Sequence, residues 1–105
     1  MPTINEILEE RQKDYGSPAQ DFLRVQRMFG AWMQGREINR DFETEALIRH
    51  TVYMILVKLS RLAHNPRHVD SRVDIGGYME CLNMAFHELD MARAHHTNPA
   101  SDEHA

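Results

Sequence analysis

Four charged side chains lie close to the point where two predicted helices join. Lys58 and Arg61 stand one helical turn apart, and Asp70 and Asp74 stand one turn apart after a short connection. Carboxylates at positions i and i+4 share one helix face and supply the oxygen ligands that Mg²⁺ prefers. A lysine and an arginine neutralise phosphate oxygens, and arginine adds a bidentate fork. The spacing therefore predicts a site for a phosphate-bearing ligand, with Mg²⁺ held by Asp70 and Asp74.

A purely structural interpretation of the same residues stays open. Asp70 or Ser71 is a suitable N-cap for the fourth predicted helix, and Asp74 completes a variant capping box with Ser71. Lys58 and Arg61 near the end of the third helix interact favourably with its dipole and can pair with the aspartates. On these local rules, caps and salt bridges account for the charges as well as a ligand does.

Two glycines lie within this region, residues 58–78, which we call the corner. Gly76 and Gly77 inside a helix cost about 2 kcal/mol relative to two alanines. A helix usually carries such a cost where another helix or a ligand approaches it closely. We therefore expect something to pack against the first turns of the fourth helix, on the side of Asp74 and Tyr78.

Local start and stop signals predict four helices and no strand. Thr3 and Glu6 form a capping box before the first helix, and Ser17-Pro18 begins the second. Gly16 suits the end of the first helix, and Asn65-Pro66 ends the third because the residue before proline avoids the helical region. The predicted helices cover residues 4–14, 18–33, from 39 or 41 to 64, and from 70 or 71 onward.

These helices predict a single all-α domain over residues 1–94, a four-helix bundle with a long central third helix. Residues 95–105 have no apolar period and are expected to form a disordered tail. A chain of 105 residues buries only roughly two-thirds of its unfolded surface. We therefore expect a homo-oligomer, which would bury more.

The third predicted helix is apolar on two sides. One stripe suits the core of the domain. The other lies on roughly the opposite side, and its steps of three and four residues match a coiled-coil seam. The helix is therefore either central in the bundle or part of a subunit interface. The core stripe is Ile48, Val52, Ile55, Leu59 and Leu62, and the expected interface is His50, Tyr53, Met54 and Val57.

Charge and composition exclude several classes of function. A formal charge of −4 argues against extended binding to nucleic acid or to an anionic membrane. Cys81 is the only cysteine, which rules out an intramolecular disulfide and a zinc site of four thiolates. No signal peptide and no apolar run long enough to span a membrane is visible, so we expect a cytoplasmic protein. Serine hydrolase, P-loop and Rossmann signatures are absent.

Several segments resemble a family of short phage and prophage proteins of unknown function. They are Glu9–Gly16, Asp21-Phe22, Lys58–Leu62 and Val73–Tyr78. That family is in turn distantly similar to nucleotide-modification-associated domains and to the MazG-like all-α nucleoside triphosphate pyrophosphatases. The resemblance implies Mg²⁺ bound by acidic pairs on two helices, and assembly as dimers or tetramers. Only Asp70 and Asp74 carry over, because the other acidic pair is replaced by Lys58 and Arg61.

Two functions compete on these observations. In the first, a phage-encoded protein binds a nucleotide or related phosphate ligand in nucleotide metabolism or counter-defence. Lys58 and Arg61 would contact the phosphates, Tyr15 or Tyr78 would stack on the base, and Asp70 and Asp74 would hold Mg²⁺. An enzymatic version would be a Mg²⁺-dependent nucleoside triphosphate pyrophosphohydrolase. In the second, the chain is a non-enzymatic helical protein that inhibits or modulates a host protein through the expected interface stripe.

Overall fold

Four helices make up the computed structural model, which describes residues 1–97 and contains no strand within that range. They are α1 (Ile4–Tyr15), α2 (Pro18–Met33), α3 (Phe42–His64) and α4 (Val69–Thr97). The all-α prediction is confirmed. Helix α4 continues through Thr97, so the first residues of the expected tail, 95–97, are helical. The rest of that tail, 98–105, lies outside the described residues.

Short-range hydrogen bonds begin the first three helices where the sequence predicts. The backbone N–H of Glu6 donates to Thr3 Oγ1 at 3.1 Å, and the Thr3 N–H donates to the Glu6 carboxylate, which completes the capping box. Ser17 caps α2, and Asp41 caps α3 by accepting from the Thr44 N–H at 2.9 Å. These caps satisfy backbone N–H groups that have no partner within the helix.

The cap of α4 corrects the prediction of Asp70 or Ser71. The ring Nδ1 of His68 accepts from the Ser71 backbone N–H at 3.2 Å and lies 2.8 Å from Ser71 Oγ. Ser71 is fully buried and Asp70 is exposed. His68 therefore caps α4 in place of the more usual aspartate or serine, and Asp70 has no capping role.

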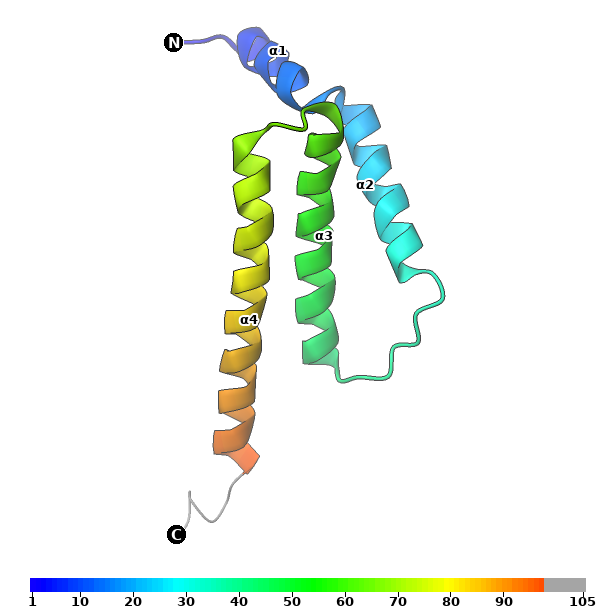
Figure 1. Ribbon diagram of the computed structural model, residues 1–105, viewed down its shortest axis with the longest axis vertical. Coiled ribbons are helices and arrows are strands. Elements are labelled where there is room, and N and C mark those ends of the chain that lie inside the picture. The colour runs from blue at the N-terminus through cyan, green and yellow to red at the C-terminus, as the bar shows by residue number, and fades with distance from the viewer. Residues whose placement is uncertain (98–105) are drawn as a thin grey trace.

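The helices form a row with α3 in the middle (Figure 1). Helix α4 runs antiparallel to α3 and, among the described helices, packs against α3 alone. Helix α2 lies on the other side of α3, and α1 crosses near the connection between α3 and α4. The radius of gyration is 19.3 Å, against about 13 Å for a compact domain of this size. The helices of the predicted bundle are present, but they are spread out.

This arrangement buries few apolar side chains. Within residues 1–97 only Val25 and Leu82 are buried hydrophobic residues. Leu59 of the predicted core stripe is exposed, and the other members of that stripe are half-buried. None of the described helices is both long and apolar enough to cross a membrane. Apolar surface therefore remains uncovered on the isolated chain.

Candidate functional site

The corner brings together one of its two predicted charge pairs. Lys58 Nζ on α3 lies 2.8 Å from Asp74 Oδ2 on α4. The side chain of Lys58 is 13% exposed and that of Asp74 is 42% exposed, so the lysine is largely enclosed by its surroundings. The pair agrees with the structural interpretation of these two residues. It also means that any cation bound by Asp74 has to compete with the Lys58 ammonium.

Arg61 turns away from the aspartates and toward α1. Its guanidinium carbon lies 4.4 Å from the centre of the Tyr15 ring, which is also contacted by Arg11 at 5.1 Å. The ring of His68 meets Tyr15 edge to face, with centroids 5.2 Å apart. A tyrosine ring attracts cations through its negative face. The Tyr15 ring thus contacts Arg11 on α1, Arg61 on α3 and His68 in the connection between α3 and α4.

The guanidinium of Arg61 is not fully satisfied. Its Nε is buried and has no hydrogen-bond partner within the part of the chain that the structure describes. A buried N–H without an acceptor costs about 1–3 kcal/mol. Beside it lies a cavity of about 320 Å³ between α1, α2 and α3, lined by Arg11, Asp21, Phe22, Val25, Gln26, Tyr53, Val57 and Arg61. Arg61 thus lines an open cavity, while its Nε is buried among the atoms of the described chain.

The turn between α1 and α2 places Tyr15 against α3. Gly16 adopts φ 79° and ψ −167°, a conformation open essentially only to glycine. A Cβ at this position would lie 3.2 Å from the His64 ring. That ring in turn holds α1, because His64 Nε2 lies 3.0 Å from the Lys13 carbonyl oxygen. The sharp turn and the histidine together fix Tyr15 beside Arg61.

A buried polar contact joins α2 to α3 beside this site. Ser60 Oγ donates to Asp21 Oδ1 at 2.6 Å, and Arg24 Nη1 donates to the Ser60 carbonyl at 3.1 Å. Ser60 is completely buried. The contact between Ser60, Asp21 and Arg24 was not predicted from the sequence. The signal was available: a serine inside a long apolar helix needs a hydrogen-bond partner when it is buried.

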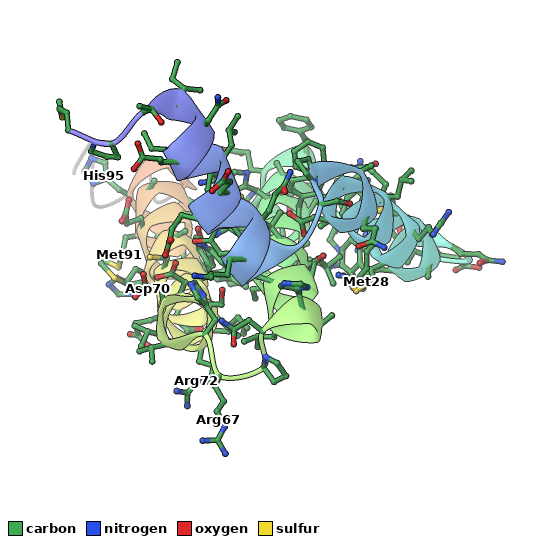
Figure 2. All side chains as sticks on the ribbon, turned by 90° about the horizontal axis from the view of Figure 1, so that it is seen from above. Met28, Arg67, Asp70, Arg72, Met91 and His95 are labelled. Carbon is green, nitrogen blue, oxygen red and sulfur yellow. The ribbon has the colours of Figure 1, made fainter. Side chains whose placement is uncertain are left out.

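The remaining predicted ligand residues are spread around the corner. Asp70 is exposed on α4 and makes no ion pair with any described residue (Figure 2). Tyr78 is half-buried on α4. No cluster of three or more histidine, cysteine, aspartate or glutamate side chains suited to a metal occurs among residues 1–97. A metal here would therefore depend on ligand and water oxygens as well.

The glycine pair does not have the close neighbour that we expected. A Cβ built on Gly76 or on Gly77 would meet no atom of the described chain within 4 Å.

Of the four residues of the expected interface on α3, Tyr53 packs on α2, where its ring meets Phe29 edge to face at 5.4 Å. His50 is exposed, and Met54 and Val57 are half-buried.

The fold and the corner together define a small all-helical protein with a cation-bearing cavity between its helices. The chain belongs to the family described as "Domain of unknown function (DUF6378)", whose model matches residues 2–86. It is 35% identical over 83 residues to the Gene 55 protein of Mycobacterium phage L5, covering 78% of this chain and 49% of that protein. It is 32% identical over 79 residues to the Gene 55 protein of Mycobacterium phage D29, covering 75% and 47%.

The chain thus spans about half the length of the curated relatives that it matches. Both relatives are phage proteins, which supports the interpretation of this chain as a phage protein. No solved structure matches it.

Proposed function

We propose that this phage protein binds a nucleotide or a related phosphate-bearing ligand at the corner. It would act in the cytoplasm of the infected host, in nucleotide metabolism or in counter-defence. The observation that carries the proposal is Arg61, whose buried Nε lacks an acceptor beside an open cavity. A phosphate in the cavity would bind the guanidinium of Arg61, and Arg11, which also lines the cavity, adds a second positive charge. Tyr15 already stacks on both guanidinium groups.

Mg²⁺ fits the proposal as a companion of the phosphate. Asp70 and Asp74 lie one turn apart on α4, and Mg²⁺ in such sites commonly combines one or two carboxylates with phosphate oxygens and water. In the structure the Lys58 ammonium forms an ion pair with the Asp74 carboxylate at 2.8 Å. Binding of a magnesium–phosphate complex would exchange partners, since Mg²⁺ would take the carboxylate and a phosphate would take the lysine. This exchange leaves no buried charge without a counter-charge.

A panel of nucleoside triphosphates, monophosphates and cyclic dinucleotides, each with and without Mg²⁺, tests this function by thermal shift. At a ligand concentration of about 100 times Kd the melting temperature should rise by about 10 °C or more, and more with Mg²⁺ than without. In Asp74→Asn the shift should lose its dependence on Mg²⁺, whereas Asp90→Asn, farther along α4, should keep it. No shift with any member of the panel would overturn the proposal. Pyrophosphate release in the same samples separates hydrolysis from binding alone.

The second candidate function, a helical interaction protein, draws support from the uncovered apolar surface. With two buried hydrophobic residues and a radius of gyration of 19.3 Å, the described chain lacks the core that a stable domain of this size needs. A second copy is the first partner that we propose, and a host protein is the other. Either would cover the half-buried Met54 and Val57 and the exposed His50 on α3.

Met54→Glu tests the interaction surface. A charge buried at an interface is strongly unfavourable, so the variant should shift the mass measured by light scattering toward the monomer or abolish capture of a host protein. Met28→Glu adds the same charge at a half-buried methionine of α2 and should change neither the measured mass nor the capture of a host protein. Unchanged mass and unchanged capture in a folded Met54→Glu variant would contradict an interface at this stripe.

A further inference from the structure

A second site lies at the other end of α3, around the buried carboxylate of Glu45. Arg36 binds this carboxylate with both terminal nitrogens, at 2.9 and 3.1 Å. Arg49 binds it through Nε at 3.2 Å and Nη2 at 3.0 Å, and Arg40 reaches it with Nε at 3.8 Å. Hydrogen bonds from Arg36, aided by those from Arg49, lower the pKa of Glu45. The carboxylate therefore stays charged and cannot take up a proton near neutral pH.

The arginines outnumber the acid. Three guanidinium groups around one carboxylate leave an excess of two positive charges. Arg36 is occupied, because it also lies 3.9 Å above the centre of the Trp32 ring. The side chains of Arg40 and Arg49 are each 41% exposed, and Arg40 approaches Glu45 through one nitrogen only. Their remaining N–H groups are available to an anion.

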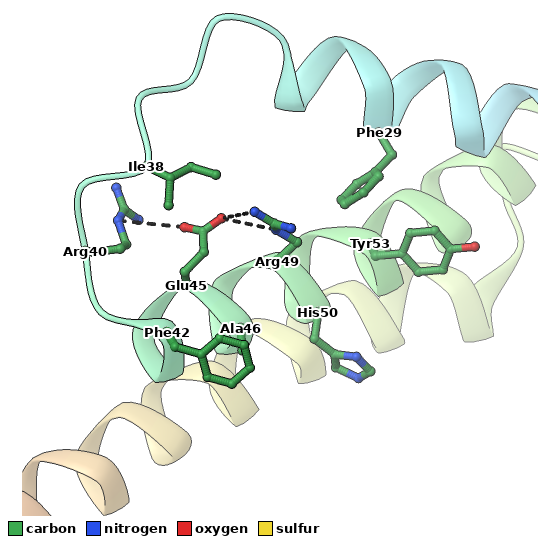
Figure 3. Close-up of a pocket in the computed structure, with 9 residues that line it drawn as sticks. All are labelled: Phe29, Ile38, Arg40, Phe42, Glu45, Ala46, Arg49, His50 and Tyr53. Carbon is green, nitrogen blue, oxygen red and sulfur yellow. Dashed lines mark hydrogen bonds and ion pairs between the residues drawn. The ribbon is translucent and has the colours of Figure 1, made fainter.

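An open apolar cavity lies against these two arginines. Its volume is about 590 Å³, within the range of about 300–1,000 Å³ typical of small-molecule sites. Figure 3 shows aromatic rings around it and the guanidinium groups of Arg40 and Arg49 on either side of the Glu45 carboxylate. Phe42 lines this cavity and is 82% exposed, so the isolated chain leaves a large apolar side chain in water. The lining consists of Phe29, Ile38, Arg40, Phe42, Glu45, Ala46, Arg49, His50 and Tyr53.

We propose that this cavity binds a small aromatic anion, a flat ring that carries one carboxylate or phosphate group. The ring would lie among Phe29, Phe42 and Tyr53, where aromatic walls favour stacking and edge-to-face contacts. The anionic group would bind Arg40 and Arg49. A neutral ring would leave the excess positive charge unpaired, and a bare anion would leave the apolar walls in water, so the site calls for both parts in one molecule.

This site is separate from the corner. Glu45 and Arg61 stand sixteen positions apart on the same helix, which is about 24 Å at 1.5 Å per residue. Tyr53 lines both cavities, but the two sites share no arginine. The proposal for the cavity beside Glu45 therefore does not depend on the ligand at the corner. A test of one site does not decide whether the other site binds its ligand.

Titration calorimetry with 2-naphthoate and its neutral amide, 2-naphthamide, tests the proposal on the full chain. Naphthoate should bind at one site per chain and about tenfold more tightly than the amide, because charge-assisted hydrogen bonds add to the burial of the ring. Arg40→Gln should weaken naphthoate about tenfold and leave the amide unchanged. Its single long contact to Glu45 is weak, so the helical circular dichroism should stay the same.

Arg72→Gln is the matched control, since it removes the same charge near the start of α4 and should alter neither affinity. Figure 1 shows that the start of α4 lies at the other end of the row of helices from the connection between α2 and α3, which carries Arg40. Ala46→Trp fills the cavity and should abolish binding of both probes. Equal affinity for the two probes, or naphthoate binding that Arg40→Gln leaves intact, overturns the proposal. So does a wild-type chain that binds neither probe while Ala46→Trp lowers its oligomeric mass, because a second copy of the chain then occupies the cavity.

Discussion

Replacing Arg61 with glutamine is expected to weaken binding of a phosphate ligand by about 10- to 100-fold, the effect of losing about 1.5–3 kcal/mol of charge-assisted hydrogen bonding. Arg61 is the residue of the corner whose buried Nε lacks an acceptor, and its guanidinium is already held over Tyr15. The ligand would therefore find the donor in place, without an ordering cost. Titration calorimetry with inorganic pyrophosphate and with the best nucleotide of the panel measures the change.

Two further variants make this result specific. Arg67→Gln removes the same charge from the nearby connection, where Figure 2 shows the side chain pointing away from the helices, and should change affinity little. Arg61→Lys keeps the charge but loses the planar fork and the stacking geometry, so it should restore only part of the affinity. If folded Arg61→Gln binds as tightly as the wild type, the phosphate does not bind at Arg61.

Gly16→Ala is expected to lower the free energy of unfolding by more than the roughly 1–3 kcal/mol that its backbone conformation alone costs a non-glycine residue. The added Cβ would also lie 3.2 Å from the ring of His64, which holds the Lys13 carbonyl. Relief of that contact would move α1 and with it Tyr15. The melting temperature should fall by at least about 4 °C, and the affinity of the corner for phosphate should fall with it.

Gly35→Ala separates the two causes. Gly35 also has a positive φ, at 73°, but a Cβ there would meet nothing within 4 Å, so this variant should show the backbone cost alone and leave phosphate binding intact. Gly76→Ala, in an open helical position, should stabilise the chain by up to about 1 kcal/mol. A Gly16→Ala variant no less stable than Gly35→Ala would show that the His64 contact does not matter.

The helices were predictable because their ends depend on neighbours within a few residues. Thr3 with Glu6, and Ser17 with Pro18, form caps that any context would favour, and the structure has helices starting directly after Thr3 and Ser17. The start of α4 shows the limit of that approach. His68 caps it because its ring reaches Ser71 from one turn away, and propensity rules rank aspartate and serine above histidine.

Of the corner, the contact between α3 and α4 was predictable and the rest was not. A short connection forces the two helices side by side, so Lys58 and Asp74 meet. Arg61 was placed with the aspartates on the same grounds, yet it stacks on Tyr15, more than forty positions earlier in the chain. No local rule says which cation a tyrosine on another helix will attract.

The amino-acid sequence by itself determined the four helices, the caps of the first three and the pairing of α3 with α4, because these depend on hydrogen bonds and connections that span few residues. The tertiary structure alone decided where α1 and α2 lie against α3. That placement gives Arg61 its aromatic partner on α1 and brings Asp21 and Arg24 of α2 against the buried Ser60. Contacts between distant residues form only where the loops and the packing of whole helices allow them, so composition and spacing do not reveal them.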